Sequence, residues 1–251
     1  MHSSAVLRKE KHMFRETIRL GGMEIGIALR SDRFGPLLEP FRSGGAPQVC
    51  AQVSDERIAS ARRIYPDDSD ETYLEYMELC SCISDVLIPF GRVIFHGTSF
   101  VWRQKAWIFG ALSGTGKTTQ YVLWKSLFGE EIQMLNGDKP LLEFRGDGIW
   151  VHPTPWRGKE HMGQMLSASL GGVILLKQRD TNRIRRVHAA DCAARLFVQF
   201  QFGRETPEQV REVCALEERL LRGVPVWLLE NRGDEASALL GYKTLAEEMS
   251  E

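Results

Sequence analysis

The sequence predicts an α/β fold that tends towards α+β, built around a mixed β-sheet rather than a fully parallel one. Two observations lead to this prediction. Short apolar segments with the pattern of strands alternate with longer helical segments, and pairs of strand-like segments joined by turns outnumber strand–helix–strand units. The length of 251 residues is enough for one large domain or two small ones.

The first 91 residues are predicted to form a small β-rich region that includes one helix. Between Thr17 and Leu29, apolar residues partly alternate around Gly21-Gly22, which predicts a β-hairpin. The segment from Gly35 to Pro47 is rich in proline and glycine and is expected to be a connection. The elements predicted after it are strands at 49–53 and 59–65, an acidic turn at 66–70 and a helix at 72–83.

From Arg92 onwards the pattern is clearer, and residues 92–251 are predicted to form a second unit. Strands are expected at 93–96, 100–103, 106–109, 132–135, 172–177 and 224–229, and a hairpin at 141–144 and 149–152. Helices are expected at 118–128, where Gly129 ends the helix, and at 189–200, 207–221 and 234–249.

Composition excludes several classes of protein. The chain carries 32 Lys and Arg against 33 Asp and Glu, so no broad field indicates binding to nucleic acid or to a membrane. The cluster Arg183, Arg185 and Arg186 is local and is expected to be a solvated strand edge. The N-terminus, 1–14, lacks the apolar core of a signal peptide, and no apolar run is long enough to span a bilayer.

The cysteines indicate a reducing environment. They are odd in number and show no C-x-x-C spacing, which argues against a disulfide framework or a zinc site. Reduced thiols in a cytoplasmic protein fit this pattern better. The five residues are Cys50, Cys80, Cys82, Cys192 and Cys214.

A glycine-rich turn ending in Lys-Thr lies between the predicted strand 106–109 and the predicted helix 118–128. Its two glycines can adopt positive φ, so that successive backbone N–H groups point into one concavity. Its lysine is then placed to reach the β- and γ-phosphates of a nucleotide, and its first threonine to ligate Mg²⁺. The pattern predicts a phosphate-binding loop at a helix N-terminus. The loop residues are Ser113, Gly114, Thr115, Gly116, Lys117, Thr118 and Thr119.

The loop departs from the usual pattern at one position. The spacing G-x4-G-K-[ST] calls for glycine at 111, where this chain has Ala111, with Gly110 one residue earlier. Alanine costs little there if its φ is negative.

Phosphoryl transfer also needs a carboxylate near the phosphates, to hold Mg²⁺ and to orient or deprotonate the acceptor. Asp138 ends the predicted strand 132–135 and lies 21 residues after Lys117, about one helix and one return strand away. It is therefore the predicted partner of the loop. Lys139 follows it directly and is either a second phosphate contact or a surface lysine.

Other candidate residues lie on either side of this pair. His96 ends a strand in the same region, although a single histidine is more often structural. The segment 154–160 combines proline, tryptophan, glycine and cations, and Arg157 and Lys159 are suited to neutralising a transferring phosphoryl group. His152 and His161 are nine residues apart, which makes a metal pair unexpected.

Taken together, these motifs resemble the HPr kinase/phosphorylase family and its phosphoenolpyruvate-carboxykinase-like relatives, in particular the shorter HPr-kinase-related kinases of bacteria. The likeness runs from about residue 92 to residue 229. It rests on His96-Gly97, the loop at 113–118, Asn136 to Pro140 and Thr154 to Lys159, in this order.

The resemblance implies a mixed-sheet P-loop kinase core over 92–251 that binds ATP and Mg²⁺. It implies that Lys117 and Thr118 hold the nucleotide and metal, that Asp138 serves as base and metal ligand, and that His96 pairs with the acidic segment. It also implies self-association, as in many relatives. The acceptor implied is a serine on a peptide or small protein, for example a ribosomally made precursor such as that of a lasso peptide.

The chain also differs from the family. The bifunctional members carry two adjacent Asp residues where this chain has Gly137-Asp138, so the resemblance does not extend to phosphorolysis. Residues before Arg92 match the family only through a β-rich start.

Three functions are consistent with the sequence. The first is an ATP- and Mg²⁺-dependent kinase acting on a hydroxyl of a peptide or small protein. The second is a small-molecule kinase, which would have a closed pocket beside Asp138 rather than an open groove. The third is a non-catalytic ATP-binding regulatory protein. It is consistent with the presence of one carboxylate where the bifunctional family members have two. No Asn-Lys-x-Asp element of a GTPase and no Leu-Ser-Gly-Gly-Gln element of an ABC ATPase is present.

Overall fold

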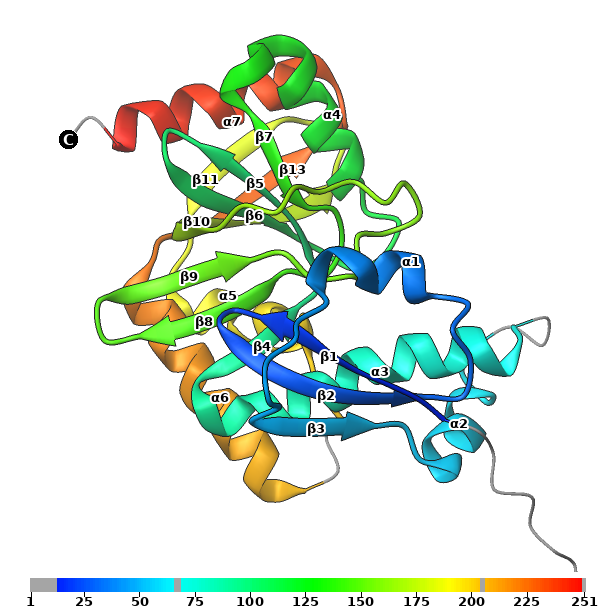
Figure 1. The fold of residues 1–251 in the computed structure, drawn as a ribbon. Coiled ribbons are helices and arrows are strands. Elements are labelled where there is room, and N and C mark those ends of the chain that lie inside the picture. The colour runs from blue at the N-terminus through cyan, green and yellow to red at the C-terminus, as the bar shows by residue number, and fades with distance from the viewer. Residues whose placement is uncertain (1–12, 66–68, 204–205, 250–251) are drawn as a thin grey trace, which may run out of the picture.

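The computed structural model describes residues 13–65, 69–203 and 206–249. Two predictions extend beyond them: the N-terminus without a signal-peptide pattern falls largely in 1–12, and the acidic turn includes 66–68. The described residues form two β-sheets, a small one near the N-terminus and a large one that carries most of the helices (Figure 1).

The small sheet begins with the predicted hairpin, which is confirmed. Strands β1 (Phe14–Leu20) and β2 (Met23–Leu29) pair antiparallel around the two-residue turn Gly21-Gly22, whose φ values are 52° and 79°. Strand β3 (Val49–Gln52) adds to β2 in parallel and confirms the strand predicted at 49–53. The connection predicted at 35–47 contains two short helical turns, α1 (Gly35–Leu38) and η1 (Glu39–Phe41).

The strand predicted at 59–65 is wrong, because residues up to Ala61 belong to helix α2 (Asp55–Ala61). Ser54 caps this helix by accepting a hydrogen bond from the backbone N–H of Arg57, and Asp55 and Glu56 lie in the first turn, where carboxylates stabilise the helix dipole. These cap signals outweigh the β-like composition of 59–65. The helix predicted at 72–83 is confirmed as α3 (Glu71–Leu87), which is followed by η2 (Ile88–Phe90).

The large sheet is mixed, as predicted. Its strands follow the order β12-β4-β8-β9-β10-β6-β5-β7, with β13 paired to β10 and β11 paired to β13. Strand β10 is parallel to β6 and β13 and antiparallel to β9, so this long strand joins the two halves of the sheet. The strands are β4 (Arg92–Phe95), β5 (Gly97–Trp102), β6 (Lys105–Gly110), β7 (Gln133–Asn136), β8 (Leu141–Arg145), β9 (Gly148–His152), β10 (Ala168–Gln178), β11 (Arg183–Arg186), β12 (Phe200–Gln201) and β13 (Val226–Asn231).

Helices pack on both halves of this sheet. Helices α4 (Lys117–Phe128) and α7 (Glu235–Glu248) cover an aromatic core that includes Trp102 and Trp124, while η3 (Gly129–Glu131) follows α4. Helices α5 (Ala189–Phe197) and α6 (Pro207–Gly223) pack on the half that contains β4 and β8 (Figure 1). The helix predicted at 189–200 ends early, because Phe200 and Gln201 pair with β4 as strand β12.

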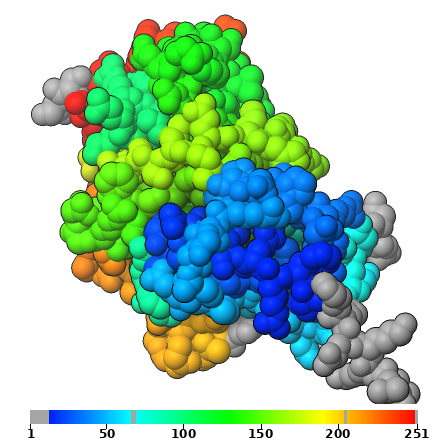
Figure 2. Space-filling view, in the orientation of Figure 1, coloured from blue at the N-terminus to red at the C-terminus, as the bar shows by residue number. Residues whose placement is uncertain are grey.

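The N-terminal region and the large sheet share a hydrophobic core. Ile94, Leu141 and Trp156 pack with the apolar side chains of β1, β2, α2 and α3. In the space-filling view the N-terminal region lies directly against the segment that follows β9 (Figure 2). The division of the chain at residues 91 and 92 stays a prediction, but the 153–157 segment is clearly packed against residues from the N-terminal region.

The described residues also show how the cysteines and the arginine cluster are placed. The five cysteines are unpaired, three of them buried and two exposed. Arg183, Arg185 and Arg186 are exposed on β11, the strand-edge position predicted for them. No helix in the described ranges combines the length and apolar character needed to cross a bilayer.

Helix α6 contains a buried acid that makes stability depend on pH. Glu217 is 7 % exposed, and its Oε1 has no hydrogen-bond partner within the described structure. Burial raises the pKa of this carboxyl to about 7, and the hydrogen bond from the Phe197 backbone offsets only part of that effect. The unfolded chain releases the proton near pH 4.5, so folding stability is highest below that pH and is lost as pH rises to about 7.

We therefore expect Glu217→Gln to stabilise the protein at pH 8 by about 1–3 kcal/mol and to have little effect at pH 4.5. Denaturant unfolding at both pH values measures the difference. The exposed Glu212→Gln on the same helix is the control and should change neither. A similar ΔΔG of Glu217→Gln at the two pH values would contradict the assignment.

Candidate functional site

The predicted phosphate-binding loop lies between β6 and α4. Gly114 and Gly116 have φ of 78° and 98°, the left-handed conformation that the prediction requires of them. Ala111 is buried and is not among the residues of positive φ, so the departure from the usual pattern costs no backbone strain. Helix α4 begins at Lys117 and has no side-chain cap, which leaves its first backbone N–H groups available to an anion.

The loop side chains differ in exposure. Ser113 and Thr119 are exposed, whereas Thr115 and Thr118 are half-buried. Lys117 is buried, and its Nζ donates to the carbonyl oxygens of Ala111 at 2.9 Å and Leu112 at 3.3 Å. Burial lowers the pKa of this ammonium, while the charge of Asp138 opposes the shift.

The opposite side of the site is a turn at the end of β7, organised by Asn136. The Asn136 Oδ1 accepts the backbone N–H groups of Asp138 at 3.0 Å and Lys139 at 2.8 Å. The carbonyl of Asp138 in turn accepts from the backbone N–H of Gly97 at 2.8 Å, at the junction of β4 and β5. Asp138 and His96 are thereby held at the ends of neighbouring strands. Asn136 belongs to the motif at 136–140, but no role was predicted for its side chain, although an Asn two residues before Asp138 is a turn signal.

Three of the predicted side chains converge here. His96 Nε2 lies 3.2 Å from Lys117 Nζ and 3.4 Å from Asp138 Oδ1. Burial on its own would raise the pKa of the Asp138 carboxyl, but the hydrogen bond from His96 and the charges of Lys139, His96 and Lys117 hold it below its usual value. Asp138 is therefore ionised at neutral pH and suited to bind a cation or accept a proton.

The Nε2 atom of His96 contacts two partners with opposite requirements. It can accept a hydrogen bond from Lys117 only when unprotonated, and it can donate one to Asp138 only when it carries a proton. One nitrogen therefore links the phosphate loop to the carboxylate, and it can serve only one of them at a time.

Gly137 is required by a close approach of the chain. A Cβ atom at this position would lie 2.6 Å from the Arg157 carbonyl oxygen and 3.1 Å from that of Met162. The backbone N–H of Gly137 also donates to Met162 at 3.0 Å. A second carboxylate at position 137 is therefore sterically incompatible with this arrangement of the 157–162 segment.

The remaining predicted residues take different positions. Arg157 is half-buried; its Nε contacts the carbonyl oxygen of Thr154 and its Nη1 that of Gly163, both at 3.4 Å. Lys159 is exposed. Lys139 is not a surface lysine: it is 8 % exposed, and although burial lowers its pKa, the neighbouring Cys80 and Asp138 raise it overall.

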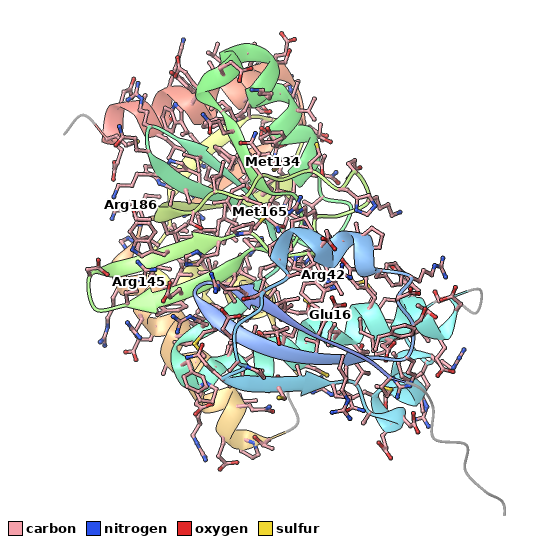
Figure 3. All side chains as sticks on the ribbon, in the orientation of Figure 1. Glu16, Arg42, Met134, Arg145, Met165 and Arg186 are labelled. Atoms are coloured by element: carbon pink, nitrogen blue, oxygen red, sulfur yellow. The ribbon has the colours of Figure 1, made fainter. Side chains whose placement is uncertain are left out.

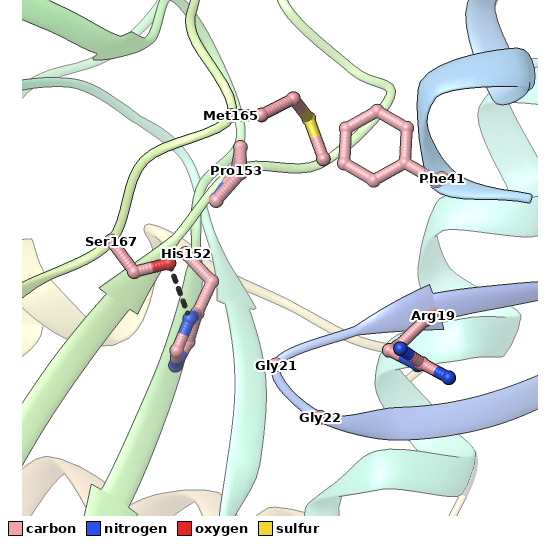
Figure 4. Close-up of a pocket in the computed structure, with 8 residues that line it drawn as sticks. All are labelled: Arg19, Gly21, Gly22, Phe41, His152, Pro153, Met165 and Ser167. Carbon is pink, nitrogen blue, oxygen red and sulfur yellow. Dashed lines mark hydrogen bonds between the residues drawn. The ribbon is translucent and has the colours of Figure 1, made fainter.

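A cavity of about 180 Å³ lies at the junction of the N-terminal hairpin and the segment after β9 (Figure 4). Its walls include Phe41, Met165 and the turn Gly21-Gly22. His152, also in the wall, has its Nδ1 2.8 Å from Ser167 Oγ and its Nε2 2.9 Å from Glu143 Oε2. Both ring nitrogens of His152 therefore have a hydrogen-bond partner.

The residues fit ATP with Mg²⁺. Open helix amides and a buried lysine suit a polyphosphate, and Thr118 and Asp138 offer the oxygen ligands that Mg²⁺ prefers. Within the described ranges, no three His, Cys, Asp or Glu side chains form a metal cluster. A divalent ion bound by one carboxylate and one hydroxyl takes its other ligands from phosphate oxygens and water, which is usual for Mg²⁺.

Comparisons with known proteins give distant similarity at the level of structure. No protein-family model matches the chain, and a search of curated proteins finds no match. Among solved structures, the chain is similar to the structure of the Hpr(Ser) kinase/phosphatase from Coxiella burnetii, with a TM-score of 0.37 and 12% sequence identity, over 62% of this chain and 90% of that chain. Likeness at this level carries no functional conclusion.

The close approach at Gly137 gives a stability prediction. We expect Gly137→Ala to destabilise the protein by about 1–3 kcal/mol, because the methyl group collides with a backbone carbonyl that cannot rotate away. The control is Gly146→Ala, since a Cβ at Gly146 meets nothing within 4 Å. Chemical denaturation measures both variants, and equal stability of the two would show that the 157–162 segment moves freely.

Proposed function

We propose that this protein is a cytoplasmic ATP- and Mg²⁺-dependent kinase that transfers a phosphoryl group to a hydroxyl, a serine on a peptide or small protein, and that it is related to the HPr kinases. The observation that carries the proposal is the convergence of Lys117, His96 and Asp138, with contacts of 3.2 and 3.4 Å to one imidazole nitrogen. A phosphate loop alone indicates nucleotide binding. A loop lysine in contact with a His–Asp pair supports a role in phosphoryl transfer as well, because it brings an ionised carboxylate close to the proposed phosphate site.

Residues of the loop bind and orient the nucleotide. The N–H groups at the start of α4 and the ammonium of Lys117 hold the phosphates, and Thr118 with Asp138 holds Mg²⁺. When bound, the metal neutralises negative charge on the β- and γ-phosphates. Lys117 bonds to its own loop carbonyls and to His96, and phosphate oxygens are stronger acceptors for these donors than neutral carbonyls.

Asp138 and His96 orient the acceptor hydroxyl. With Lys117 engaged by phosphate, His96 Nε2 is free to donate to one oxygen of Asp138, which leaves the other to accept the proton of the incoming hydroxyl. Lys159, the exposed one of the two predicted cations, stabilises charge on the transferring group. Because position 137 has no room for a second carboxylate, the reverse reaction with inorganic phosphate is expected to be weak.

The nucleotide site is tested by a thermal shift. ATP-Mg at 100 times its Kd should stabilise the native protein by about 2.7 kcal/mol through mass action. Lys117→Ala should remove most of this shift, whereas Lys125→Ala, in the last turn of the same helix, should keep it. An unchanged shift in Lys117→Ala would show that the phosphates bind elsewhere.

The transfer step is tested by removing the charge of Asp138. Asp138→Asn keeps the size of the side chain, so nucleotide binding should remain in large part, while transfer to a degenerate serine-peptide library should fall about 10²- to 10⁴-fold. Asp147→Asn in an exposed turn is the control. Normal transfer by Asp138→Asn, or rapid phosphate-driven dephosphorylation by the native protein, would contradict the assigned roles.

A further inference from the structure

Arg157 differs from the other half-buried arginines in the described part of the chain. These are Arg30, Arg57 and Arg92, and each forms an ion pair with a carboxylate of low exposure. Arg30 lies 2.7 Å from Glu75, and Arg57 lies 2.5 Å from Asp85. Arg157 has the same level of burial but no carboxylate within ion-pair distance in the described ranges. Partial burial of a guanidinium without an anion has a desolvation cost that a bound anion would offset, which suggests that an anion binds there.

The hydrogen bonds of Arg157 are also weak. Its Nε, Nη1 and Nη2 reach the Thr154 carbonyl, the Gly163 carbonyl and the Met165 sulfur, each at 3.4 Å. The two N–H···O distances exceed the usual range for such bonds, and a thioether sulfur is a weak acceptor. The remaining contact is the ring of Phe41, 5.2 Å from the guanidinium carbon. Burial lowers the pKa of Arg157, as expected for a cation that lacks a nearby negative charge.

The backbone of Arg157 lies beside the proposed transfer site. Its carbonyl oxygen borders Gly137, and a Cβ on Gly158 would lie 3.5 Å from the Cβ of Asp138. The guanidinium, however, extends towards Met165 and Phe41, which line the cavity at the N-terminal hairpin (Figure 4). The charges that act most on Asp138 are those of Lys139, His96 and Lys117, and Arg157 is not among them.

We propose that Arg157 binds a carboxylate of the acceptor peptide, and that the cavity bounded by Phe41 and Met165 receives a neighbouring side chain. This inference rests on the proposed kinase function and assigns its substrate class: a hydroxyl on an acidic peptide segment. The N-terminal region then contributes directly to acceptor recognition, because Phe41 forms one wall.

A peptide carboxylate fits this position better than a phosphate of the nucleotide. The guanidinium has a planar set of donors that matches a carboxylate in bidentate geometry. The phosphates are held at the loop and by Lys117, and the Arg157 side chain is directed away from that cluster towards a cavity large enough for one side chain. Met165, 57 % exposed, lies where the N-terminal region meets the large sheet, so this end of the cavity is open to solvent (Figure 3).

The first test measures binding without turnover. Two fluorescein-labelled pools of seven-residue peptides carry a central serine and degenerate flanks; one pool contains Asp and Glu, and the other Asn and Gln in their place. Fluorescence anisotropy is measured with the full chain and a non-hydrolysable ATP analogue with Mg²⁺. The native protein should bind the acidic pool about tenfold or more tightly than the amide pool. Equal binding of the two pools would overturn the proposal.

Variants of Arg157 assign the preference to this side chain. Arg157→Met should abolish the preference for the acidic pool, Arg157→Lys should retain part of it, and Arg103→Met at an exposed site should retain all of it. ATP-Mg should stabilise Arg157→Met as much as the native protein. If Arg157→Met kept the preference, the peptide anion would bind elsewhere. If Arg157→Met lost the ATP-Mg shift, the guanidinium would bind the nucleotide. Either result overturns the proposal.

A second pair of variants tests the direction of the guanidinium. Because Met165 Sδ lies 3.4 Å from Arg157 Nη2, Met165→Glu places a carboxylate within reach of the Arg157 guanidinium. This variant should compete with the acidic pool and weaken its binding about tenfold, whereas the isosteric Met165→Gln should not. Equal effects of the two substitutions would overturn the proposal. Failure of the kinase assignment is seen separately, as native protein that binds the acidic pool but phosphorylates neither pool.

Discussion

The site depends on one buried amide. Asn136 has no exposed surface, and its side chain makes four hydrogen bonds: Oδ1 accepts two backbone N–H groups, and Nδ2 donates to the carbonyl oxygen and hydroxyl of Thr154 at 3.1 and 3.2 Å. The amide thus joins the turn that carries Asp138 to the segment that carries Arg157. A buried network of this kind is favourable only when every member is satisfied, so the position of the carboxylate and that of the acceptor segment are fixed together.

The N-terminal region supports the same segment from the other side. Two hydrogen bonds link Tyr76 to this segment: the Tyr76 hydroxyl donates to the Pro155 carbonyl at 3.0 Å, and the Trp156 Nε1 donates to the Tyr76 carbonyl at 2.9 Å. Their rings stack with centroids 5.4 Å apart. The segment after β9 is therefore held between Asn136 and helix α3. About a hundred residues precede the phosphate loop. Because they pack against the segment after β9, they are part of the structure that supports the site and not a separate extension.

Much of the fold and of the site could be predicted from local sequence patterns. The features that could not be predicted depend on contacts between residues far apart in the chain. Glycine, apolar and turn signals act over a few residues, and they define the phosphate loop, the strands around it and the hairpins. These elements lie at the positions that the sequence predicts. The strand predicted at 59–65 is a helix up to Ala61, because the N-cap at Ser54 begins a helix five residues before that segment. The sequence left Lys139 open between a phosphate contact and a surface lysine, because its burial depends on residues of α3. The position of the Arg157 guanidinium depends on Phe41, which is 116 positions earlier in the chain. No local pattern encodes either contact.

The contact between Lys117, His96 and Asp138 has a further physical consequence. Nε2 of His96 has one bonding position, so any interaction that draws Lys117 away from the ring strengthens the bond between His96 and Asp138. The same movement removes one of the positive charges that hold the pKa of Asp138 low, while the stronger hydrogen bond from His96 acts in the opposite direction and keeps the carboxylate ionised and oriented. Binding at the loop and the basicity of the carboxylate are then coupled through a single ring nitrogen. This coupling requires no movement of the backbone, because the three side chains are already in contact.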